Sequence, residues 1–215
     1  MFPRLYAIID ASLLTGSEFS PDASGLAIAQ MLANSGVELI QYRNKQSNSR
    51  RVYEVSLLLS RALSKTQVRF IVNDRADIAI LAGAGGVHVG QTDLTVEQAR
   101  AVCGERRWVG VSTHTHDQLR EADKTSANYI AFGPVFATAT KENPDPVVGL
   151  DGLSQARSLT RKPLVAIGGI TLERAKEVYA AGADSICVAR DLLCTEDPSR
   201  RAREYLRIGA EAARP

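Results

Sequence analysis

Two acidic residues follow neighbouring apolar segments in the stretch FIVNDRADIAILAGAGGVHVGQTDL, residues 70–94 of this chain. The first apolar run ends in Asn73 and Asp74, and the second leads to Gln91 and Asp93. A strand–helix–strand unit of this length makes the two strands parallel neighbours, so both carboxylates leave the same end of one sheet. Because carboxylate oxygens are ligands for hard cations, a shared cation such as Mg²⁺ is one explanation for two acidic groups at this position.

The same acidic residues also have a structural interpretation as helix caps. Asn73 and Asp74 precede a helix, where Asn and Asp commonly cap the N-terminus, and capping and cation binding suit this position equally well. Asp93 is harder to explain as a cap. Thr95, with Gln98 at the spacing of a capping box, already begins the next helix.

Eight short β-rich runs recur along the chain and would position these residues. They are separated by segments with helical spacing, and they occupy residues 4–10, 38–43, 69–73, 86–90, 108–113, 129–134, 164–169 and 185–190. Strands that are apolar on both faces and alternate with helices favour parallel pairing buried on both sides. An open doubly wound sheet and a closed barrel both fit this alternation. The count of eight favours a (β/α)₈ TIM barrel, formed by residues 1–215 as a single domain with its active site at the C-terminal rim of the strands.

Helix boundaries support this reading of the chain. Ser20-Pro21 predicts the start of a helix that ends at Gly36, and Thr95 predicts one that Gly104 closes. Thr171 likewise predicts a helix that ends near Gly182.

Composition excludes several functional classes. The 215 residues carry a net charge of +2 with both signs interspersed, so we expect no nucleic-acid-binding face and no membrane-binding segment. The three cysteines, Cys103, Cys187 and Cys194, have no metal-ligand spacing. Their odd number is typical of a reducing compartment, and we expect a cytoplasmic protein.

Basic and amide side chains follow the second predicted strand in the sequence QYRNK. Alternation along the strand places Gln41, Arg43 and Lys45 on one side and Tyr42 and Asn44 on the other. Two cations and an amide at a barrel mouth suit a polyanionic ligand, although a solvated basic turn has the same composition.

The three histidines differ in what their positions predict. His114 follows Ser112 and Thr113 at the end of the fifth strand, where it is a candidate acid or base, or a hydrogen-bonding spacer. His88 lies within an apolar strand and is expected to be a satisfied core group. His116 is expected at an exposed helix start.

The longest connection at the predicted rim is GPVFATATKENPDPVVGL, residues 133–150. Connections longer than about 12–15 residues without secondary structure are often lids or binding elements. Thr138, Thr140 and Lys141 offer hydroxyls and an ammonium to an anionic substrate, while a surface loop is the alternative interpretation.

Glycines and an arginine follow the last two strands. Gly168 and Gly169 would let backbone N–H groups approach a phosphate, which barrels often bind between these loops. Arg190 would add a charge-assisted hydrogen bond to that phosphate, or would pair with Asp191 or Asp184 instead. The rim thus predicts two anion sites, one assisted by a cation near strands 2–4 and one lined by glycine near strands 7–8.

The motifs QYRNK, NDRADIA, GVHVGQTDL, VGVSTHT, YIAFGPVFATATK, AIGGIT and AGADS resemble those of the thiamine-phosphate synthase family in order and spacing, across residues 4–193. Members of that family are (β/α)₈ barrels. They are transferases that join hydroxymethylpyrimidine diphosphate to thiazole phosphate, giving thiamine monophosphate and pyrophosphate. The resemblance implies these two small-molecule substrates, and it leaves the oligomeric state open, with a homodimer as one option.

The resemblance also implies roles for individual residues. Asp74 and Asp93 would bind Mg²⁺. The pyrimidine diphosphate would contact Gln41, Arg43, Lys45, Asn73, Ser112 and Lys141. The thiazole phosphate would face Thr138, Thr140, Gly169 and the residues after strand 8.

The reaction implied is a dissociative substitution in which pyrophosphate leaves first and the thiazole nitrogen captures the resulting pyrimidinylmethyl cation. Arg43, Lys45 and Lys141, together with Mg²⁺, would stabilise the leaving group. The family commonly has a branched aliphatic residue and a serine after strand 8, where this chain has Ala189 and Arg190. This departure affects the phosphate site more than the overall function.

Two other functions fit parts of the sequence. A thiazole tautomerase on the same barrel would need no diphosphate site, which leaves Asp74, Asp93 and Lys141 without a task, and would give His114 the role of base. A non-catalytic sensor of thiamine phosphates is the second alternative, although the chain carries no obvious DNA-binding helix.

Overall fold

Eight parallel strands close into a barrel in the computed structural model, which describes residues 1–14, 21–138 and 145–212. The strands follow one another around the ring in chain order, and β8 pairs with β1 to close it. Their bounds are β1 Leu5–Asp10, β2 Leu39–Arg43, β3 Arg69–Asn73, β4 Gly86–Val89, β5 Trp108–Thr113, β6 Tyr129–Phe132, β7 Leu164–Ile167 and β8 Ser185–Val188. The predicted (β/α)₈ barrel is therefore confirmed, and the open doubly wound sheet is excluded.

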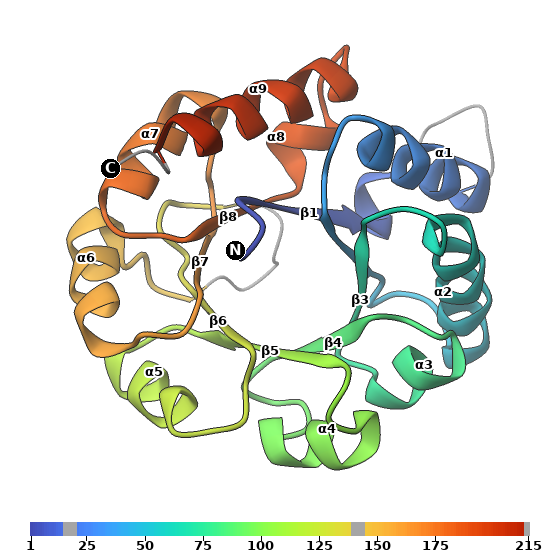
Figure 1. Ribbon diagram of the computed structural model, residues 1–215, viewed down its shortest axis with the longest axis horizontal. Helices are drawn as coiled ribbons and strands as arrows, with labels where there is room; N and C mark the ends of the chain where they lie inside the picture. Colours follow the sequence, from blue (N-terminus) through green and yellow to red (C-terminus); the bar gives the residue numbers. More distant parts are fainter. Residues whose placement is uncertain (15–20, 139–144, 213–215) are drawn as a thin grey trace.

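Helices surround this barrel on its outside, as Figure 1 shows. Their bounds are α1 Pro21–Asn34, α2 Ser49–Leu63, α3 Ala76–Leu81, α4 Val96–Cys103, α5 His116–Asp123, α6 Gly149–Leu159, α7 Ala175–Ala180, α8 Arg190–Leu193 and α9 Pro198–Ala212. Short 3₁₀ turns, η1 and η2, occupy Ala11–Leu13 and Leu172–Arg174. The largest apolar cluster fills the layer between the strands and this ring of helices.

The predicted helix signals are mostly present in the structure. Thr95 and Gln98 form a complete capping box at the start of α4, and Gly104 ends that helix with a positive φ of 71°. Thr171 begins a 3₁₀ turn rather than an α-helix, and its side chain makes no capping hydrogen bond. Ser20 lies outside the described residues, while Pro21 is the first residue of α1.

The interior of the barrel is filled by every second side chain of each strand. Register pairs Ile8 with Gln41, and Gln41 with Ile71, so these three side chains point the same way. They belong to an inner layer that is separate from the strand–helix core and includes Tyr6, Leu39, Tyr129, Ala131, Val165 and Cys187. Polar groups within this layer need internal partners because no water-filled channel runs along a barrel of this size.

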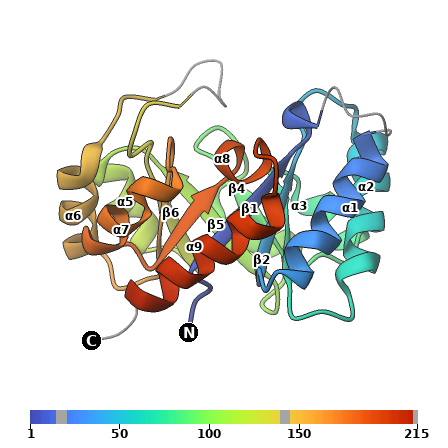
Figure 2. The ribbon, with the colours of Figure 1, turned by 90° about the horizontal axis from the view of Figure 1, so that it is seen from above.

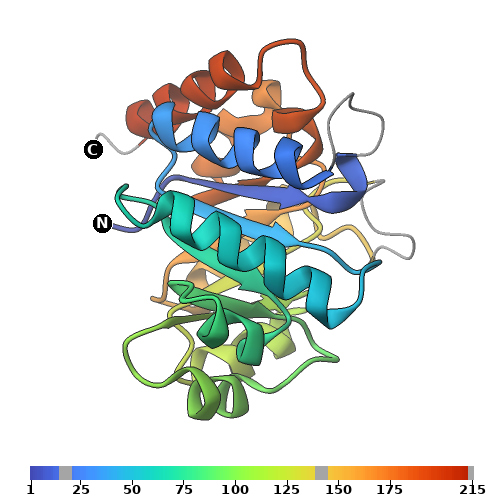
Figure 3. The same ribbon diagram turned by 90° about the vertical axis from the view of Figure 1, so that its right-hand side faces the viewer.

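Aromatic side chains cover the amino end of this inner layer. Phe2 stacks on Trp108 with ring centroids 5.3 Å apart and also meets Tyr129 at 5.4 Å. The Arg69 guanidinium lies over the Trp108 ring, 4.2 Å from its centre. In Figures 2 and 3 the N-terminus lies at this end of the barrel, and Figure 2 places α8 toward the other end.

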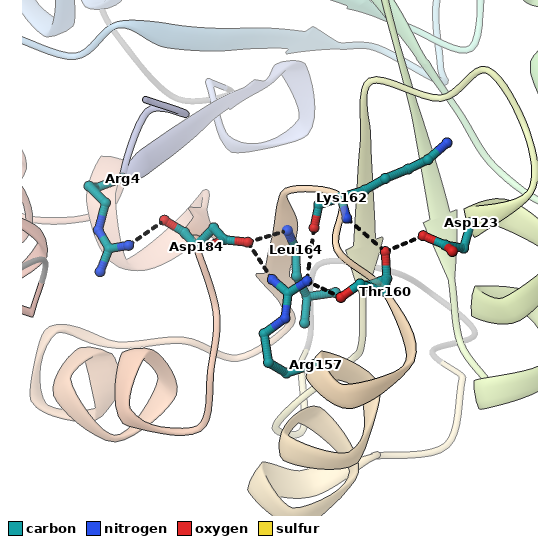
Figure 4. A network of polar contacts seen from close by, with 7 residues as sticks. All are labelled: Arg4, Asp123, Arg157, Thr160, Lys162, Leu164 and Asp184. Atoms are coloured by element: carbon teal, nitrogen blue, oxygen red, sulfur yellow. Dashed lines mark hydrogen bonds and ion pairs between the residues drawn. The ribbon is translucent and has the colours of Figure 1, made fainter.

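A network of charged groups joins the loops that precede β7 and β8, as shown in Figure 4. The Asp184 carboxylate accepts hydrogen bonds from Arg157 at 2.5 Å and from the backbone N–H of Leu164 at 2.8 Å. Arg4 donates to the Asp184 carbonyl at 2.9 Å, and the Thr160 hydroxyl donates to Asp123. This set of contacts fixes the amino ends of the last two strands, so Asp184 has a structural role.

Two further sequence expectations concern the environment of the chain. Cys103, Cys187 and Cys194 form no disulfide, and the first two are buried. Among the helices that the structure describes, none has the length and apolar character needed to cross a membrane.

Gly110 is required by the packing of the inner layer, since a Cβ at this position would lie 2.0 Å from Cζ of Tyr129. We predict that Gly110→Ala lowers the free energy of unfolding by about 1–3 kcal/mol, the usual cost of overpacking a filled core. Urea denaturation followed by circular dichroism measures this change. Gly25→Ala is the matched control, because its Cβ would meet Leu14 at an ordinary 3.6 Å. Equal stability of the two variants would contradict the prediction.

Candidate active site

A cavity of about 520 Å³ opens at the carboxyl ends of the strands, within the size range of sites for small molecules. Its walls come from the ends of β1, β2, β5, β6, β7 and β8 and from the loops that follow them. Several residues that the sequence analysis selected line it: Arg43, Ser112, His114, Thr138, Gly169, Ala189 and Arg190. The rim rule for barrels therefore located a common site from strands far apart in sequence.

The two carboxylates of the 70–94 stretch lie in contact beside this cavity. The side chain of Asp74, which follows β3, lies close enough to that of Asp93, which follows β4, for the two carboxyl groups to interact. Asp93 also accepts a hydrogen bond from the backbone N–H of Gly90 at 2.7 Å. A Cβ on Gly90 would lie 2.9 Å from that carboxylate oxygen, so the glycine lets Asp93 fold back toward Asp74.

Capping does not explain either carboxylate. The residue that caps α3 is Arg75, with no side-chain capping bond, and Thr95 caps α4. Asp74 instead adopts a φ of 61°, which is uncommon for a residue other than glycine and is tolerated best by Asn and Asp. Its backbone N–H donates to the carbonyl of His88 at 2.7 Å, and this bond holds the turn against β4. The interpretation of Asn73 and Asp74 as helix caps is therefore wrong.

The proximity of these groups disturbs the titration of Asp74. Burial raises the pKa of the Asp74 carboxyl above its usual value, the hydrogen bond with Asp93 raises it further, and the Lys45 ammonium opposes both. Lys45 lies 3.1 Å from the Asp74 carboxylate. Two carboxylates held this close favour either a shared proton or a cation between them.

The donor set suits a magnesium ion that keeps several of its waters. No group of three or more His, Cys, Asp or Glu side chains arranged to hold a metal occurs among the described residues, so the pair of carboxylates would need water and ligand oxygens to complete an octahedron. This is the usual arrangement where Mg²⁺ binds through one or two carboxylates and the phosphates of a substrate.

The basic residues after β2 reach two different carboxylates. The Arg43 guanidinium donates to Asp10 at 2.5 Å and lines the cavity, whereas Lys45 reaches Asp74. Asn44 donates to the Tyr42 hydroxyl at 3.0 Å on the other side of the strand, as the predicted alternation requires. Arg43 and Lys45 therefore connect the cavity to the acidic pair.

Asp10 was not identified from the sequence. It ends β1, is 1% exposed, and accepts hydrogen bonds from the Ser12 backbone N–H and hydroxyl at 3.0 and 2.7 Å as well as from Arg43. The register of β1 with β2 places Asp10 directly opposite Arg43. Asp10 lies at the carboxyl end of the first predicted strand, where the active-site residues of such barrels are found, and this position could have identified it.

Gln41 and Asn73, which the sequence predicts as substrate contacts, are not part of the cavity wall. Gln41 is buried in the inner layer of the barrel and donates to the Tyr6 hydroxyl at 2.6 Å. Asn73 ends β3 opposite His88 and precedes Asp74. Lys45, Asp74 and Asp93 are likewise not among the residues that line the cavity, whereas Arg43 of the neighbouring strand β2 is.

The histidines have distinct surroundings. His88 is buried between Tyr129 and Ser112, at 3.0 and 2.8 Å, which confirms that it is a satisfied core group. His116 begins α5 as expected, but it is half-buried rather than exposed: its ring stacks on Phe132 and hydrogen bonds with the Gly152 carbonyl at 2.9 Å.

His114 lines the cavity and bridges two parts of the loop that follows β6. Its Nδ1 lies 2.6 Å from the Gly133 carbonyl, which can only accept, so this nitrogen carries a proton. Its Nε2 lies 3.4 Å from the Asp145 carboxylate. The geometry thus uses His114 to hold residues 133 and 145 together at the cavity wall.

The glycines after β7 are required by close packing as well as by their backbone conformation. Gly168 and Gly169 have φ values of 99° and 62°. A Cβ on Gly168 would lie 2.4 Å from Pro134, and one on Gly169 would lie 2.3 Å from the Ala137 carbonyl. Both glycines line the cavity, as the sequence analysis expected of this loop.

Arg190 faces the same part of the cavity and does not pair with either proposed carboxylate. Asp191 accepts from Arg201 at 2.8 Å and from the Tyr205 hydroxyl at 2.6 Å, and Asp184 is held by Arg157. Arg190 is exposed at the start of α8. Of the two roles considered from the sequence, the contact with an anionic ligand is the one that this geometry leaves open.

Only part of the loop after β6 is described. Thr138 lines the cavity, while Thr140 and Lys141 lie outside the described residues. Arg174, which the sequence analysis did not select, also lines the cavity, stacks over Phe136 at 4.4 Å and donates to the Gly169 carbonyl at 3.0 Å. It joins the loops after β6 and β7.

Comparison with known proteins gives a consistent result. A family model described as thiamine monophosphate synthase matches residues 5–192. The thiamine-phosphate synthase of Koribacter versatilis is 52% identical over 209 residues, covering 96% of this chain and 95% of that protein. That of Halalkalibacterium halodurans is 39% identical over 194 residues, covering 90% of this chain and 89% of that protein.

A solved structure extends the similarity to the fold. The thiamine phosphate pyrophosphorylase from Pyrococcus furiosus superimposes with a TM-score of 0.85 at 29% sequence identity, covering 98% of this chain and 97% of that one.

The raised pKa of Asp74 predicts how this residue affects the free energy of unfolding at different pH values. Between the ordinary aspartate pKa of 3.8 and the raised value, the folded protein binds more protons than the unfolded one, so this residue lowers stability as pH rises through that window. With a metal chelator present, Asp74→Asn should therefore raise the free energy of unfolding at pH 7, and this gain should vanish near pH 3. Urea denaturation at both pH values measures the effect, and Asn suits the positive φ.

Asp77→Asn is the control with the opposite sign. The pKa of Asp77 is lowered by its hydrogen bonds with Arg75, so this carboxylate stabilises the folded protein at neutral pH. A gain in stability for both variants, or for neither, would contradict the effect assigned to Asp74.

Proposed function

Because the chain belongs to the thiamine monophosphate synthase family, we propose that it couples 4-amino-5-hydroxymethyl-2-methylpyrimidine diphosphate to a thiazole phosphate. The products are thiamine monophosphate and pyrophosphate. The observation that carries this proposal is the contact between Asp74 and Asp93 with Lys45 at 3.1 Å, next to a cavity of about 520 Å³. A diphosphate is the substrate group that such a mixed acidic and basic cluster suits.

The pyrimidine diphosphate would occupy the side of the site near β2–β5. Arg43 and Lys45 would contact the phosphate oxygens, with Gln41, Asn73 and Ser112 as further contacts. The ion pair between Arg43 and Asp10 engages one nitrogen of the guanidinium, and the remaining donors of its fork can bind phosphate. Lys141, outside the described residues, would supply another cation.

Asp74 and Asp93 would hold a Mg²⁺ ion through carboxylate oxygens. When bound, the ion neutralises negative charge on the diphosphate and so makes pyrophosphate a better leaving group. The observation that supports this fit is the contact between two carboxylates, one of which has a raised pKa. A cation between them would remove the need for a shared proton.

The bond that breaks joins the pyrimidine methylene carbon to a diphosphate oxygen, and the electron pair leaves with pyrophosphate. The lone pair of the thiazole nitrogen then forms the new carbon–nitrogen bond, which gives a thiazolium. Arg43, Lys45 and Lys141 stabilise charge on the departing group. No protein nucleophile is needed, which fits a cavity whose Cys187 thiol has a pKa raised by burial.

The cavity protects the intermediate cation. Ile8, Ile167, Ile170 and Val188 contribute apolar wall, and they exclude water that would otherwise capture a pyrimidinylmethyl cation. The amount of excluded water decides whether the cation meets the thiazole nitrogen or is hydrolysed.

The thiazole phosphate would occupy the side formed by the loops after β6, β7 and β8. Thr138, Gly169, Ala189 and Arg190 line this part of the cavity, and Thr140 would belong to it. Arg190 takes the place of the serine that is common in the family. It would bind the phosphate through a charge-assisted hydrogen bond, and its side chain is longer than that of serine.

Three further properties belong to the proposal. The three free thiols suit action in the reducing cytoplasm. The ligands are two small molecules, with Mg²⁺ as the cofactor. A thiazole tautomerase and a non-catalytic sensor remain the alternative functions that the following assay separates.

The test is an assay of the purified protein with both substrates and Mg²⁺. We expect pyrophosphate and thiamine monophosphate to appear in equal amounts, measured by a coupled phosphate assay and by chromatography. A tautomerase would instead change the thiazole phosphate alone, and a sensor would give neither product. Absence of both products under conditions where calorimetry detects both ligands would overturn the proposal.

Asp93→Asn tests the metal role within the same assay. Loss of one carboxylate should lower kcat by about 100-fold, because it weakens the charge stabilisation of the leaving group, and should raise the Mg²⁺ concentration needed for half-maximal rate. Asp77→Asn, on the exposed start of α3, should leave both quantities unchanged. Wild-type kinetics in Asp93→Asn would exclude it as a metal ligand.

Arg190→Ala tests the second anion site. We expect KM for the thiazole phosphate to rise about tenfold, in line with loss of one charge-assisted hydrogen bond, while KM for the pyrimidine diphosphate stays the same. Arg190→Lys should recover part of the affinity, and Arg207→Ala, on the outer face of α9, is the control. An equal rise in both KM values would show that Arg190 does not recognise the thiazole phosphate.

A further inference from the structure

A continuous series of hydrogen bonds crosses the interior of the barrel and ends at the cavity. The Gln41 amide nitrogen lies 2.6 Å from the Tyr6 hydroxyl, which lies 2.8 Å from the Tyr129 hydroxyl. Tyr129 in turn lies 3.0 Å from His88 Nδ1, and His88 Nε2 lies 2.8 Å from the Ser112 hydroxyl. We call these five side chains the interior chain. Of its members, Ser112 lines the cavity.

The fold makes room for this chain at a cost in apolar packing. Tyr6 and Tyr129 are 1% and 0% exposed, and burial of two hydroxyls is unfavourable unless each is hydrogen bonded. Gly110 is paired with both His88 and Tyr129 in the β-ladders. Because glycine has no side chain, the Tyr129 ring fits beside it. His88 stacks on that ring with centroids 5.5 Å apart.

The direction of the chain follows from counting donors. An amide nitrogen only donates, so Gln41 donates to Tyr6 and leaves the Tyr6 proton for Tyr129. Burial raises the pKa of both tyrosines, so each hydroxyl keeps one proton to pass on. Tyr129 then donates to Nδ1 of His88, and a neutral imidazole that accepts at Nδ1 must carry its proton on Nε2. His88 therefore donates to Ser112.

We propose that His88 is a positioning residue, held neutral with its proton on Nε2, which turns the Ser112 hydroxyl into a hydrogen-bond donor directed at the ligand. With its oxygen engaged by His88, Ser112 keeps its own proton for an acceptor atom in the cavity. Phosphate oxygens and pyrimidine ring nitrogens are acceptors of this class. The inference rests on the proposed function in taking Ser112 as a contact of the pyrimidine diphosphate.

Gln41 and Ser112, at the two ends of the chain, are thereby coupled. Gln41 commits its amide nitrogen to Tyr6, so its carbonyl oxygen stays an acceptor, while Ser112 is a donor. Ser112 is the end of the chain that lines the cavity, and the ring nitrogens of an aminopyrimidine are acceptors that match its donated proton. If any one of these hydrogen bonds ran in the opposite direction, the others would reverse as well. Ser112 would then donate to His88 and would have no proton left for an acceptor in the cavity.

The first test measures the tautomer directly and needs no substrate. With only three histidines in the chain, ¹⁵N NMR of the 23.2 kDa protein resolves each ring, and His114→Gln and His116→Gln assign the signals. We expect Nδ1 of His88 to resonate as an acceptor nitrogen and Nε2 as a protonated one. A proton on Nδ1 in the wild-type protein would overturn the proposed direction.

The second test is a double-mutant cycle between Tyr129 and Ser112. Tyr129→Phe removes the donor to His88 but keeps the ring, and it should lower kcat/KM for the pyrimidine diphosphate about tenfold in the wild-type background. In the Ser112→Ala background the same substitution should have almost no further effect. Additive losses would show that Tyr129 does not act through Ser112.

Tyr179→Phe is the matched control. This tyrosine is also buried, and it donates to the Arg4 carbonyl at 2.6 Å, near the start of β1 and away from the cavity. It should leave kcat/KM and the His88 signals unchanged. Lack of synthase activity in the wild-type protein would overturn the proposed function, whereas the His88 signals would still decide the direction of the chain.

Discussion

Filling the interior of a closed parallel barrel is the constraint on which the rest of this structure depends. Once eight strands close, every second side chain points into a space that admits neither water nor voids. The protein fills the amino end of this space with apolar and aromatic side chains. Hydrogen-bonded polar side chains lie between these and the cavity. The site at the rim rests on that filling, because Ser112 and Arg43 are the last inward residues of their strands.

The fold could be predicted from the sequence because its signals are local. The runs at residues 69–73 and 108–113 match β3 and β5 in full, since strand propensity and flanking turns both lie within a few residues. Predicted strands such as 129–134 and 164–169 extend too far. The observed strands end at Phe132 and Ile167, and the glycines that follow them, Gly133 and Gly168, pack against the Ile167 carbonyl and Pro134, respectively.

The candidate site could be predicted only where position along a strand determines it. Asp93 and Arg43 were found because they follow strands, whereas the pairing of Arg43 with Asp10 depends on the register between β1 and β2. The capping interpretation of Asp74 failed because its left-handed backbone is fixed by a bond to the His88 carbonyl on the next strand. Local sequence patterns do not predict such contacts between strands.

The aromatic cover formed by Phe2 and Trp108 at the amino end has a consequence for traffic through the site. Together with the interior chain it fills the axis of the barrel among the residues that the structure describes, and the cavity opens at the carboxyl end. In the proposed reaction, two substrates would enter and two products would leave through the mouth of this cavity. A ligand bound deeper in this cavity would then leave after one bound nearer its mouth.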